Sequence, residues 1–354
     1  MNSWERLERT FSGQETDRTP VLGGWISCPD HICKITGVDI ETYWKNPRKI
    51  SIEAYLKLHM DGVIDIAVPK TREDFRIVDA NSYVHAVTEM SLDDVLQWIE
   101  QSPSAAEIEE AFDFEGEYSK YKAGLIEVKA LCGDMVYMPA SWGAGGNLSW
   151  YNNFGYENYF IVMGAYPDHA RKLIEIGGAE GYCKGRLVAQ AVREGLYPHA
   201  LLMGEDICSQ QGPMVSPDFL KEVYAPVLRH GLEPLLDAGC RPVWHSDGNI
   251  RPLMDMLIDC GIKGFQGFQP ECGMTLEYVL EHRTKEGDPL IIFGPMAVTT
   301  ELPVLTPAEI KKRVKEAIRL CRGNARLVLF TSNTINPDVP LENIYAMYEA
   351  IREN

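Results

Sequence analysis

The sequence predicts an α/β protein with a single domain over residues 1–354. We expect a (β/α)8 or TIM barrel with a helical N-terminal segment and an insertion after the second strand. The first observation is a series of eight short apolar runs, continuous rather than alternating, as expected for parallel strands buried on both faces. The second is that amphipathic segments long enough for a crossover helix separate most of these runs. The third is that no linker rich in Pro, Gly or Ser divides the chain, whose 45% apolar content can supply one large core.

The predicted strands alternate with predicted helices along the whole chain, which is typical of a parallel barrel. An open, doubly wound sheet is the alternative. The Gly-x-Gly-x-x-Gly loop that follows the first strand of a dinucleotide-binding sheet is absent, so no nucleotide or flavin is expected. In chain order, the predicted strands are residues 20–25, 62–68, 134–140, 199–205, 241–245, 264–269, 289–295 and 326–332.

Local signals place several helices between these strands. Thr306-Pro307-Ala308-Glu309 is a capping box with proline at the first helical position. Ser216-Pro217 predicts a second capped start, and Pro340 precedes the last helix. Residues 26–60 and 70–133 exceed the minimal repeat and are expected to be mostly helical insertions. Because insertions after strand ends lie over the active face of a barrel, they could form a lid or the surface of a homodimer.

Composition excludes several classes of partner and location. The net charge of −17 repels phosphate backbones and anionic lipids, so neither nucleic acid nor a membrane surface is an expected partner. Residues 1–6 are charged where a signal peptide needs an apolar run, and no apolar stretch is long enough to span a bilayer. The nine cysteines are scattered without any Cys-x-x-Cys pair, which indicates free thiols in a reducing cytoplasm.

The most informative motif is His245-Ser246-Asp247, at the end of the fifth predicted strand. Barrel enzymes place their chemistry at the carboxyl ends of the strands. In an extended segment, residues two apart point to the same side, so His245 and Asp247 form a candidate metal-ligand or proton-transfer pair.

Other acids follow neighbouring strands and are expected at the same mouth. Glu205 and Asp206 end the fourth strand, and Glu271 follows the sixth. Carboxylates held close together raise one another's pKa unless a cation separates them, and histidine with carboxylates suits zinc, manganese or iron. We therefore predict a divalent metal, zinc among the candidates. The alternatives are that Glu205 or Asp206 only caps the next turn and that Asp247-Gly248 is a simple turn signal.

Three further residues at predicted strand ends are candidates for contact with a small-molecule substrate, namely Trp25, Trp142 and Gln269. Tyrosines and a second tryptophan follow Trp142 in the sequence. This aromatic density could line a pocket for a planar or methoxylated compound, or it could pack an insertion against the barrel.

With these positions identified, the chain resembles the uroporphyrinogen decarboxylase superfamily over most of its length. The family fold is a single (β/α)8 barrel, and its members carry out two chemistries. One is decarboxylation of uroporphyrinogen without a cofactor. The other is zinc-dependent methyl transfer between corrinoid proteins and thiols, methoxy-aromatics or other small methyl compounds. The resemblance rests on Glu5-Arg6-Leu7, Asp17-Arg18-Thr19-Pro20, Gly204-Glu205-Asp206, Gly212-Pro213-Met214-Val215-Ser216-Pro217, His245-Ser246-Asp247-Gly248 and residues 336–343.

The resemblance to the decarboxylases is incomplete. They carry an Arg-Gln-Ala-Gly-Arg motif after the first strand, whose cations bind substrate carboxylates, whereas this chain has Trp25-Ile26-Ser27-Cys28 there. Burying a polycarboxylate without such cations is prohibitive. The strand-two aspartate of the decarboxylases corresponds to Asp65 with a one-residue shift, and their late histidine falls on Asn333.

The resemblance to the methyltransferases of the coenzyme M type implies a metal site. These enzymes use His-x-Cys after strand five and a cysteine before the last helix. Here His245 matches the histidine, while Asp247 and Asn333 stand at the two cysteines. A harder site of His245, Asp247 and Glu205 or Asp206 would activate the substrate as a Lewis acid.

Three hypotheses follow from these observations. The first is a cytoplasmic methyltransferase, such as an O-demethylase, acting on a methoxy or methylamine-like compound with a corrinoid protein or thiol. In it, His245 and Asp247 hold the metal, Glu205 or Asp206 completes the site or acts as general acid, and Asn333 orients the substrate. The second is a metal-free decarboxylase for a porphyrinogen or a smaller acid, in which Asp65 stabilises a protonated pyrrole-like intermediate. The third is a non-catalytic barrel that binds a ligand.

Overall fold

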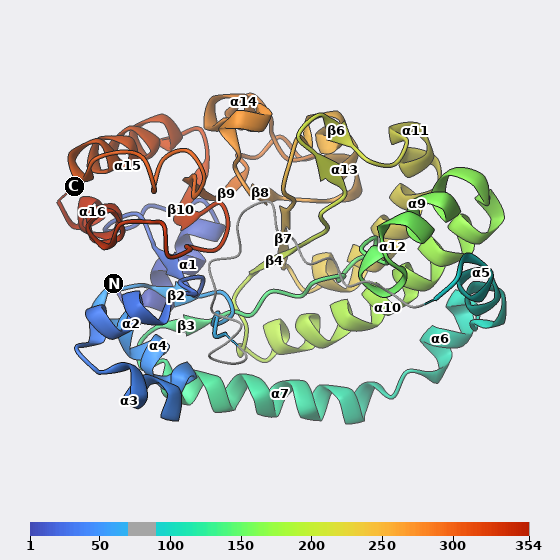
Figure 1. Cartoon of the computed structure of the whole chain (residues 1–354), viewed down its shortest axis with the longest axis horizontal. Helices are drawn as coiled ribbons and strands as arrows, with labels where there is room; N and C mark the ends of the chain where they lie inside the picture. Colours follow the sequence, from blue (N-terminus) through green and yellow to red (C-terminus); the bar gives the residue numbers. More distant parts are fainter. Residues whose placement is uncertain (70–89, 354) are drawn as a thin grey trace.

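The computed structural model describes residues 1–69 and 90–353 (Figure 1). Each of the eight predicted runs contains a strand that pairs in parallel with its neighbours. These strands are β1 (Leu22–Gly23), β2 (Gly62–Val63), β3 (Val136–Tyr137), β4 (Ala200–Gly204), β7 (Arg241–His245), β8 (Gly264–Gln266), β9 (Ile291–Met296) and β10 (Arg326–Thr331).

The strands form two parallel sheets that continue one another. Their orders are β1-β2-β3 and β10-β9-β8-β7-β4, and a parallel bridge between Val21 and Leu329 connects β1 to β10. The expectation of a closed ladder is not met, because no ladder joins β3 to β4 in residues 1–69 and 90–353. A single backbone bond, from Ser141 N–H to the Leu202 carbonyl (3.0 Å), spans that seam. Pro139 follows β3 closely and has no N–H to donate, which limits pairing there. The fold is mixed α/β with parallel sheets, consistent with the family barrel.

Helices surround the strands. The predicted helix starts are confirmed: both bonds of the Thr306–Glu309 capping box are present, Ser216 caps α11, and α16 begins directly after Pro340. None of the described helices is long and apolar enough to cross a membrane. The helices are α1 (Ser3–Phe11), α2 (Pro29–Thr36), α3 (Ile40–Lys45), α4 (Pro47–Lys57), α5 (Leu92–Gln101), α6 (Ala105–Ala111), α7 (Phe114–Leu131), α8 (Tyr151–Phe154), α9 (Tyr156–Ala165), α10 (Pro167–Arg193), α11 (Pro217–Phe219), α12 (Ala225–Asp237), α13 (Met254–Cys260), α14 (Leu276–Leu280), α15 (Pro307–Cys321) and α16 (Leu341–Arg352).

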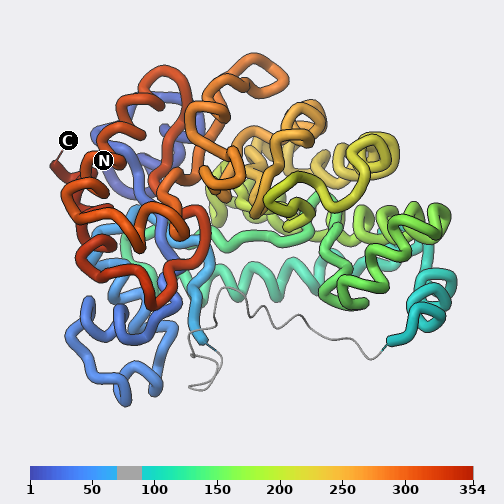
Figure 2. The backbone as a smooth tube through the Cα atoms, turned by 45° about the horizontal axis from the view of Figure 1, so that its top comes forward, coloured from blue at the N-terminus to red at the C-terminus, as the bar shows by residue number. Residues whose placement is uncertain are grey.

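Both predicted insertions are helical where they are described. Residues 26–60 hold α2, α3 and α4. Of the second insertion, residues 70–89 lie outside the described residues, and the remainder forms α5, α6 and α7. All three of these helices contact α10, and α7 runs along the molecule beside it (Figures 1 and 2). This part of the insertion therefore belongs to the outer helical layer. The sequence did not predict the small antiparallel hairpin of β5 (Cys208–Ser209) and β6 (Gly212–Pro213).

Glycines on α10 position a loop that carries functional candidates. A Cβ atom at Gly181 would lie 2.4 Å from the backbone nitrogen of Gly146, and one at Gly177 would lie 2.4 Å from the Asn147 carbonyl oxygen. Only glycine allows such a close approach of helix and loop. The loop of residues 142–149 consequently lies directly on α10, with its side chains available to the carboxyl ends of the strands.

Candidate functional site

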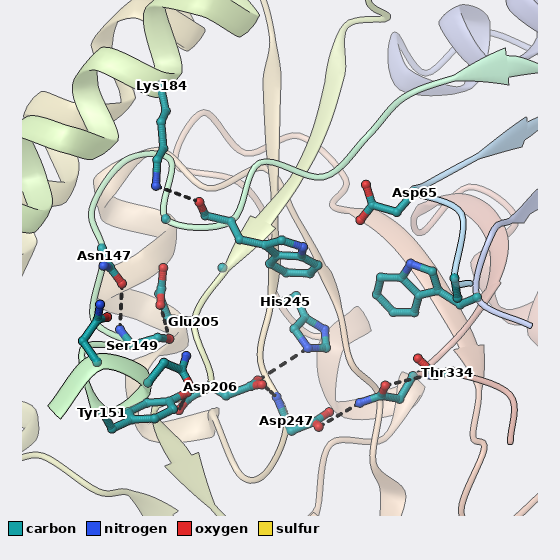
Figure 3. A pocket seen from close by; sticks show the side chains of 18 of the residues that line it. Asp65, Asn147, Ser149, Tyr151, Lys184, Glu205, Asp206, His245, Asp247 and Thr334 are labelled. Carbon is teal, nitrogen blue, oxygen red and sulfur yellow. Dashed lines mark hydrogen bonds and ion pairs between the residues drawn. The ribbon is translucent and has the colours of Figure 1, made fainter. Parts of the chain in front are cut away.

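A cavity of about 630 Å³ opens at the carboxyl ends of the strands (Figure 3). The ends of β4 and β7 and the segment after β10 supply Glu205, Asp206, His245, Asp247, Asn333 and Thr334. Its lining includes Trp25, Asp65, Trp142, Asn147, Ser149, Lys184, Glu205, Asp206, His245, Asp247 and Asn333.

Three of the lining residues form a candidate metal centre. Asp206, His245 and Asp247 each offer a ligand atom, and these atoms lie within 4.8 Å of one another. His245 Nε2 is 3.4 Å from Asp206 Oδ1, which also accepts the Asp247 backbone N–H at 2.8 Å. Figure 3 shows the three side chains facing one another. The β4–β7 pairing, which aligns Gly204 with His245, brings these segments together.

The two carboxylate oxygens of Asp247 differ in their hydrogen bonding. Its Oδ2 accepts the Asn333 amide at 2.8 Å, whereas its Oδ1 is buried and has no hydrogen-bond partner among residues 1–69 and 90–353. Burial raises the pKa of Asp247, and the nearby Asp206 carboxylate adds to this, while His245 opposes it. A buried acceptor without a partner is costly, and a cation between Asp206, His245 and Asp247 would remove that cost. One histidine and two carboxylates fit a divalent ion.

The imidazole of His245 is enclosed by protein groups. Its Nδ1 is hydrogen-bonded to Oε1 of Gln266. The indole of Trp142 lies 5.4 Å from the imidazole and that of Trp25 lies 6.0 Å away, measured between ring centroids. Both tryptophans line the cavity, so they form an aromatic wall beside the candidate metal centre.

Glu205 lies apart from the candidate metal centre. The sequence left open whether Glu205 or Asp206 completes the ligand set, and the structure brings Asp206 to it. Glu205 turns instead to Ser149, whose hydroxyl donates to its carboxylate (Figure 3). Burial raises the pKa of Glu205 to about 7.

Asp65 lines another part of the same cavity. Its backbone φ of 54° lies in the left-handed region, where aspartate and asparagine are tolerated. Its carboxylate accepts the Ala140 N–H at 3.2 Å, and burial raises its pKa from 3.8 to about 6. The cavity therefore contains, outside the candidate metal centre, a carboxyl group that changes its protonation near pH 6.

This burial predicts a pH dependence of stability. Between pH 3.8 and about 6, the unfolded chain has ionised Asp65 while the native protein retains the proton. Native Asp65 then binds more protons than the unfolded state, so the free energy of unfolding falls as pH rises, by about 3 kcal/mol in total. Asp65→Asn keeps an oxygen that can accept the Ala140 N–H, and asparagine tolerates the left-handed backbone conformation. In this variant the free energy of unfolding should not fall over this pH range. Urea unfolding in the presence of chelator, from pH 4 to 7, measures the free energy of unfolding of both proteins. The prediction is wrong if this free energy depends on pH in the same way in the variant and in the original protein.

Other sequence candidates have different surroundings from those expected. Asn333 lines the cavity, but its amide nitrogen donates to Asp247 and its oxygen accepts the Thr334 N–H at 2.6 Å. Gln269 is not among the lining residues; its oxygen accepts the Gly248 N–H at 2.5 Å and so holds the turn after Asp247. Glu271 is not among the lining residues and accepts from Thr299 at 2.7 Å, although its charge contributes to the raised pKa of Asp247.

The sequence analysis missed several residues of the site, among them Ser149, Asn147, Lys184 and Gln266. Ser149, Asn147 and Lys184 come from a loop and a helix that no strand-end rule identifies. Gln266, which holds His245, could have been found, because a glutamine within a buried apolar strand must satisfy its amide with protein groups.

The fold and the site together define a parallel α/β protein whose strand ends enclose a cavity with a candidate divalent-metal centre. The family model described as Uroporphyrinogen decarboxylase (URO-D) matches residues 153–354, more than half of the chain. The chain belongs to this family. In its fold it is similar to a methyltransferase from Methanosarcina mazei, with a TM-score of 0.60 and 14% sequence identity, over 100% of this chain and 99% of that one. No match was found among curated protein sequences.

Proposed function

We propose that this URO-D family protein is a methyltransferase. It moves a methyl group between a small methylated compound, methoxy or methylamine-like, and a corrinoid protein or a thiol. The observation that carries the proposal is the group of Asp206, His245 and Asp247 at the cavity, with Asp247 Oδ1 buried and without a partner in the described part of the chain. The fold that the chain shares with the Methanosarcina mazei methyltransferase supports it.

The chain's own residues would hold the metal and orient the substrate. Asp206, His245 and Asp247 are the ligands, and a zinc or similar ion would supply Lewis-acid stabilisation of charge on the leaving atom. The ligand set has no thiolate, so it suits oxygen and nitrogen donors better than a sulfur-rich site would. Trp25 and Trp142 form an apolar wall against which a methyl-bearing group can pack.

The methyl transfer balances with a corrinoid as the second reactant. The bond from the methyl carbon to oxygen or nitrogen breaks, and its electron pair stays on the leaving atom, which finally takes up a proton. The new bond to the methyl carbon uses an electron pair from reduced corrinoid cobalt. Asp206 and the backbone N–H of Asp247 are already joined, so the ligands are pre-organised before any substrate enters.

A metal-free decarboxylase remains the second candidate, because Asp65 lines the cavity with a raised pKa. Its substrate would be a small acid rather than a polycarboxylate. Among the described residues that line the cavity, Lys184 is the one lysine or arginine. Burying several carboxylates against one cation is unfavourable.

The deciding experiment offers the protein both reactions. Protein purified without chelator is mixed with cob(I)alamin and a panel of methoxylated aromatic compounds and methylamines, and methylcobalamin is followed by absorbance. In parallel, carbon dioxide release is measured from uroporphyrinogen and smaller aromatic acids. We expect methylcobalamin with at least one methylated compound. Carbon dioxide without methyl transfer would favour the decarboxylase. Tight ligand binding without turnover, unchanged in variants of His245 and Asp247, would favour a binding protein.

A further inference from the structure

The side-chain amide of Gln266 has one allowed orientation. Gln266 is the last residue of β8 and is 3% exposed. Its amide nitrogen donates to the carbonyl oxygens of Thr331 (2.7 Å) and Ser332 (2.8 Å), at the end of β10. Both amide hydrogens are thereby used. The flipped amide would set its oxygen against two carbonyl oxygens, so Oε1 must point away from β10, towards β7.

This orientation determines which nitrogen of His245 carries the proton. Gln266 and His245 are partners in the parallel register of β7 and β8, and Oε1 meets Nδ1. A carboxamide oxygen can only accept, so Nδ1 must donate. Neutral imidazole has one N–H, which leaves a lone pair on Nε2, the nitrogen that faces Asp206.

Asp206 opposes this arrangement. Its carboxylate lies 3.4 Å from Nε2 and would by itself favour a proton on that nitrogen, which blocks metal binding. Gly267, directly after Gln266, leaves room for the ring, because a Cβ there would lie 3.2 Å from Nδ1. The end of β10 supports both ligands: Thr331 and Ser332 fix Gln266, and Asn333 holds Asp247.

We infer that Gln266 is a positioning residue that holds His245 in the Nδ1–H tautomer and presents Nε2 as the metal ligand. This inference rests on the metal centre of the proposed function. Partners of metal-bound histidines outside the ligand set commonly contribute 10- to 100-fold in metal affinity. No step of the reaction passes through Gln266 itself.

The test reads the tautomer directly in metal-free protein. Long-range ¹H–¹⁵N correlation spectra are recorded with ¹⁵N-histidine labelling at a pH where imidazole is neutral, and the His245→Ala spectrum assigns the His245 signals. We expect the Nδ1–H tautomer in the original protein. In Gln266→Met, which has similar volume but no acceptor, the Nε2–H tautomer should become dominant and zinc affinity should fall about 10- to 100-fold.

Controls separate positioning from folding and from the proposed reaction. Gln190→Met makes the same substitution on α10, where the Gln190 amide donates to Glu194, and should change neither the tautomer nor zinc affinity. An Nε2–H tautomer in the original protein, or an unchanged tautomer in a folded Gln266→Met variant, would overturn the inference. Because the tautomer is read without metal or corrinoid, absence of methyl transfer would refute the proposed function while leaving the tautomer result intact.

Discussion

Replacing His245 with alanine is expected to abolish stoichiometric metal binding. The substitution removes one of three ligands and leaves Asp206 and Asp247 as neighbouring carboxylates without a neutral donor between them. Since loss of a partner outside the ligand set already costs 10- to 100-fold in affinity, loss of a ligand should cost at least about 100-fold. Methyl transfer should fall by a similar or larger factor. Metal content is measured in protein purified without chelator and without nickel affinity chromatography.

Thermal unfolding gives the same prediction a second readout. A metal that binds the native state stabilises it by RT ln(1 + [L]/Kd), so added zinc should raise the Tm of the original protein. It should leave the Tm of His245→Ala almost unchanged. The matched control is His230→Ala, since His230 is exposed and contacts Glu109 and Glu233 away from the cavity. A folded His245→Ala protein with full metal content and full activity would refute the metal centre.

The sequence predicted the strands well because their signal is local. Continuous apolar runs such as residues 199–205 and 326–332 form strands that are buried almost throughout, as expected for a parallel sheet covered by helices. The open seam between β3 and β4 was not predictable in the same way. It depends on how Pro139 and the loop on α10 sit against β4, which is a tertiary effect.

The candidate site was predictable only in part, for a related reason. His245, Asp247 and Asp206 lie next to strand ends, so their convergence follows from the parallel topology. The sequence alone does not show which of Glu205 and Asp206 joins the metal centre, because that depends on the direction of each side chain. At the end of β4, Glu205 points to Ser149 and Asp206 points to His245. Hydrogen bonds across non-adjacent strands, such as that from Gln266 to Thr331, leave no pattern in the sequence.

The second prediction with a large expected effect concerns the buried ion pairs of Asp61, which lie outside the cavity and stabilise the fold. Asp61 is fully buried just before β2, and its carboxylate accepts from Arg6 (2.5 Å), from Arg18 (2.7 Å) and from the Val21 N–H (2.9 Å). These partners belong to α1 and to the segment that leads into β1. Asp61 therefore joins the N-terminal helix to the first two strands. The motif around Arg6 and Asp17-Arg18 was noticed in the sequence only as part of the family resemblance.

Asp61→Ala should lower the free energy of unfolding by about 3–5 kcal/mol, because it removes the buried carboxylate that pairs with Arg18 and accepts the Val21 N–H, and one of the two carboxylates that pair with Arg6. Asp17→Ala is the matched control. Asp17 also binds Arg6, at 2.6 Å, but it is 42% exposed and leaves Asp61 in place, so the loss should be about 1 kcal/mol. Urea unfolding of the three proteins measures both values. Equal losses in the two variants would mean that burial of Asp61 contributes nothing, and that the exposed Arg6–Asp17 pair anchors α1 equally well.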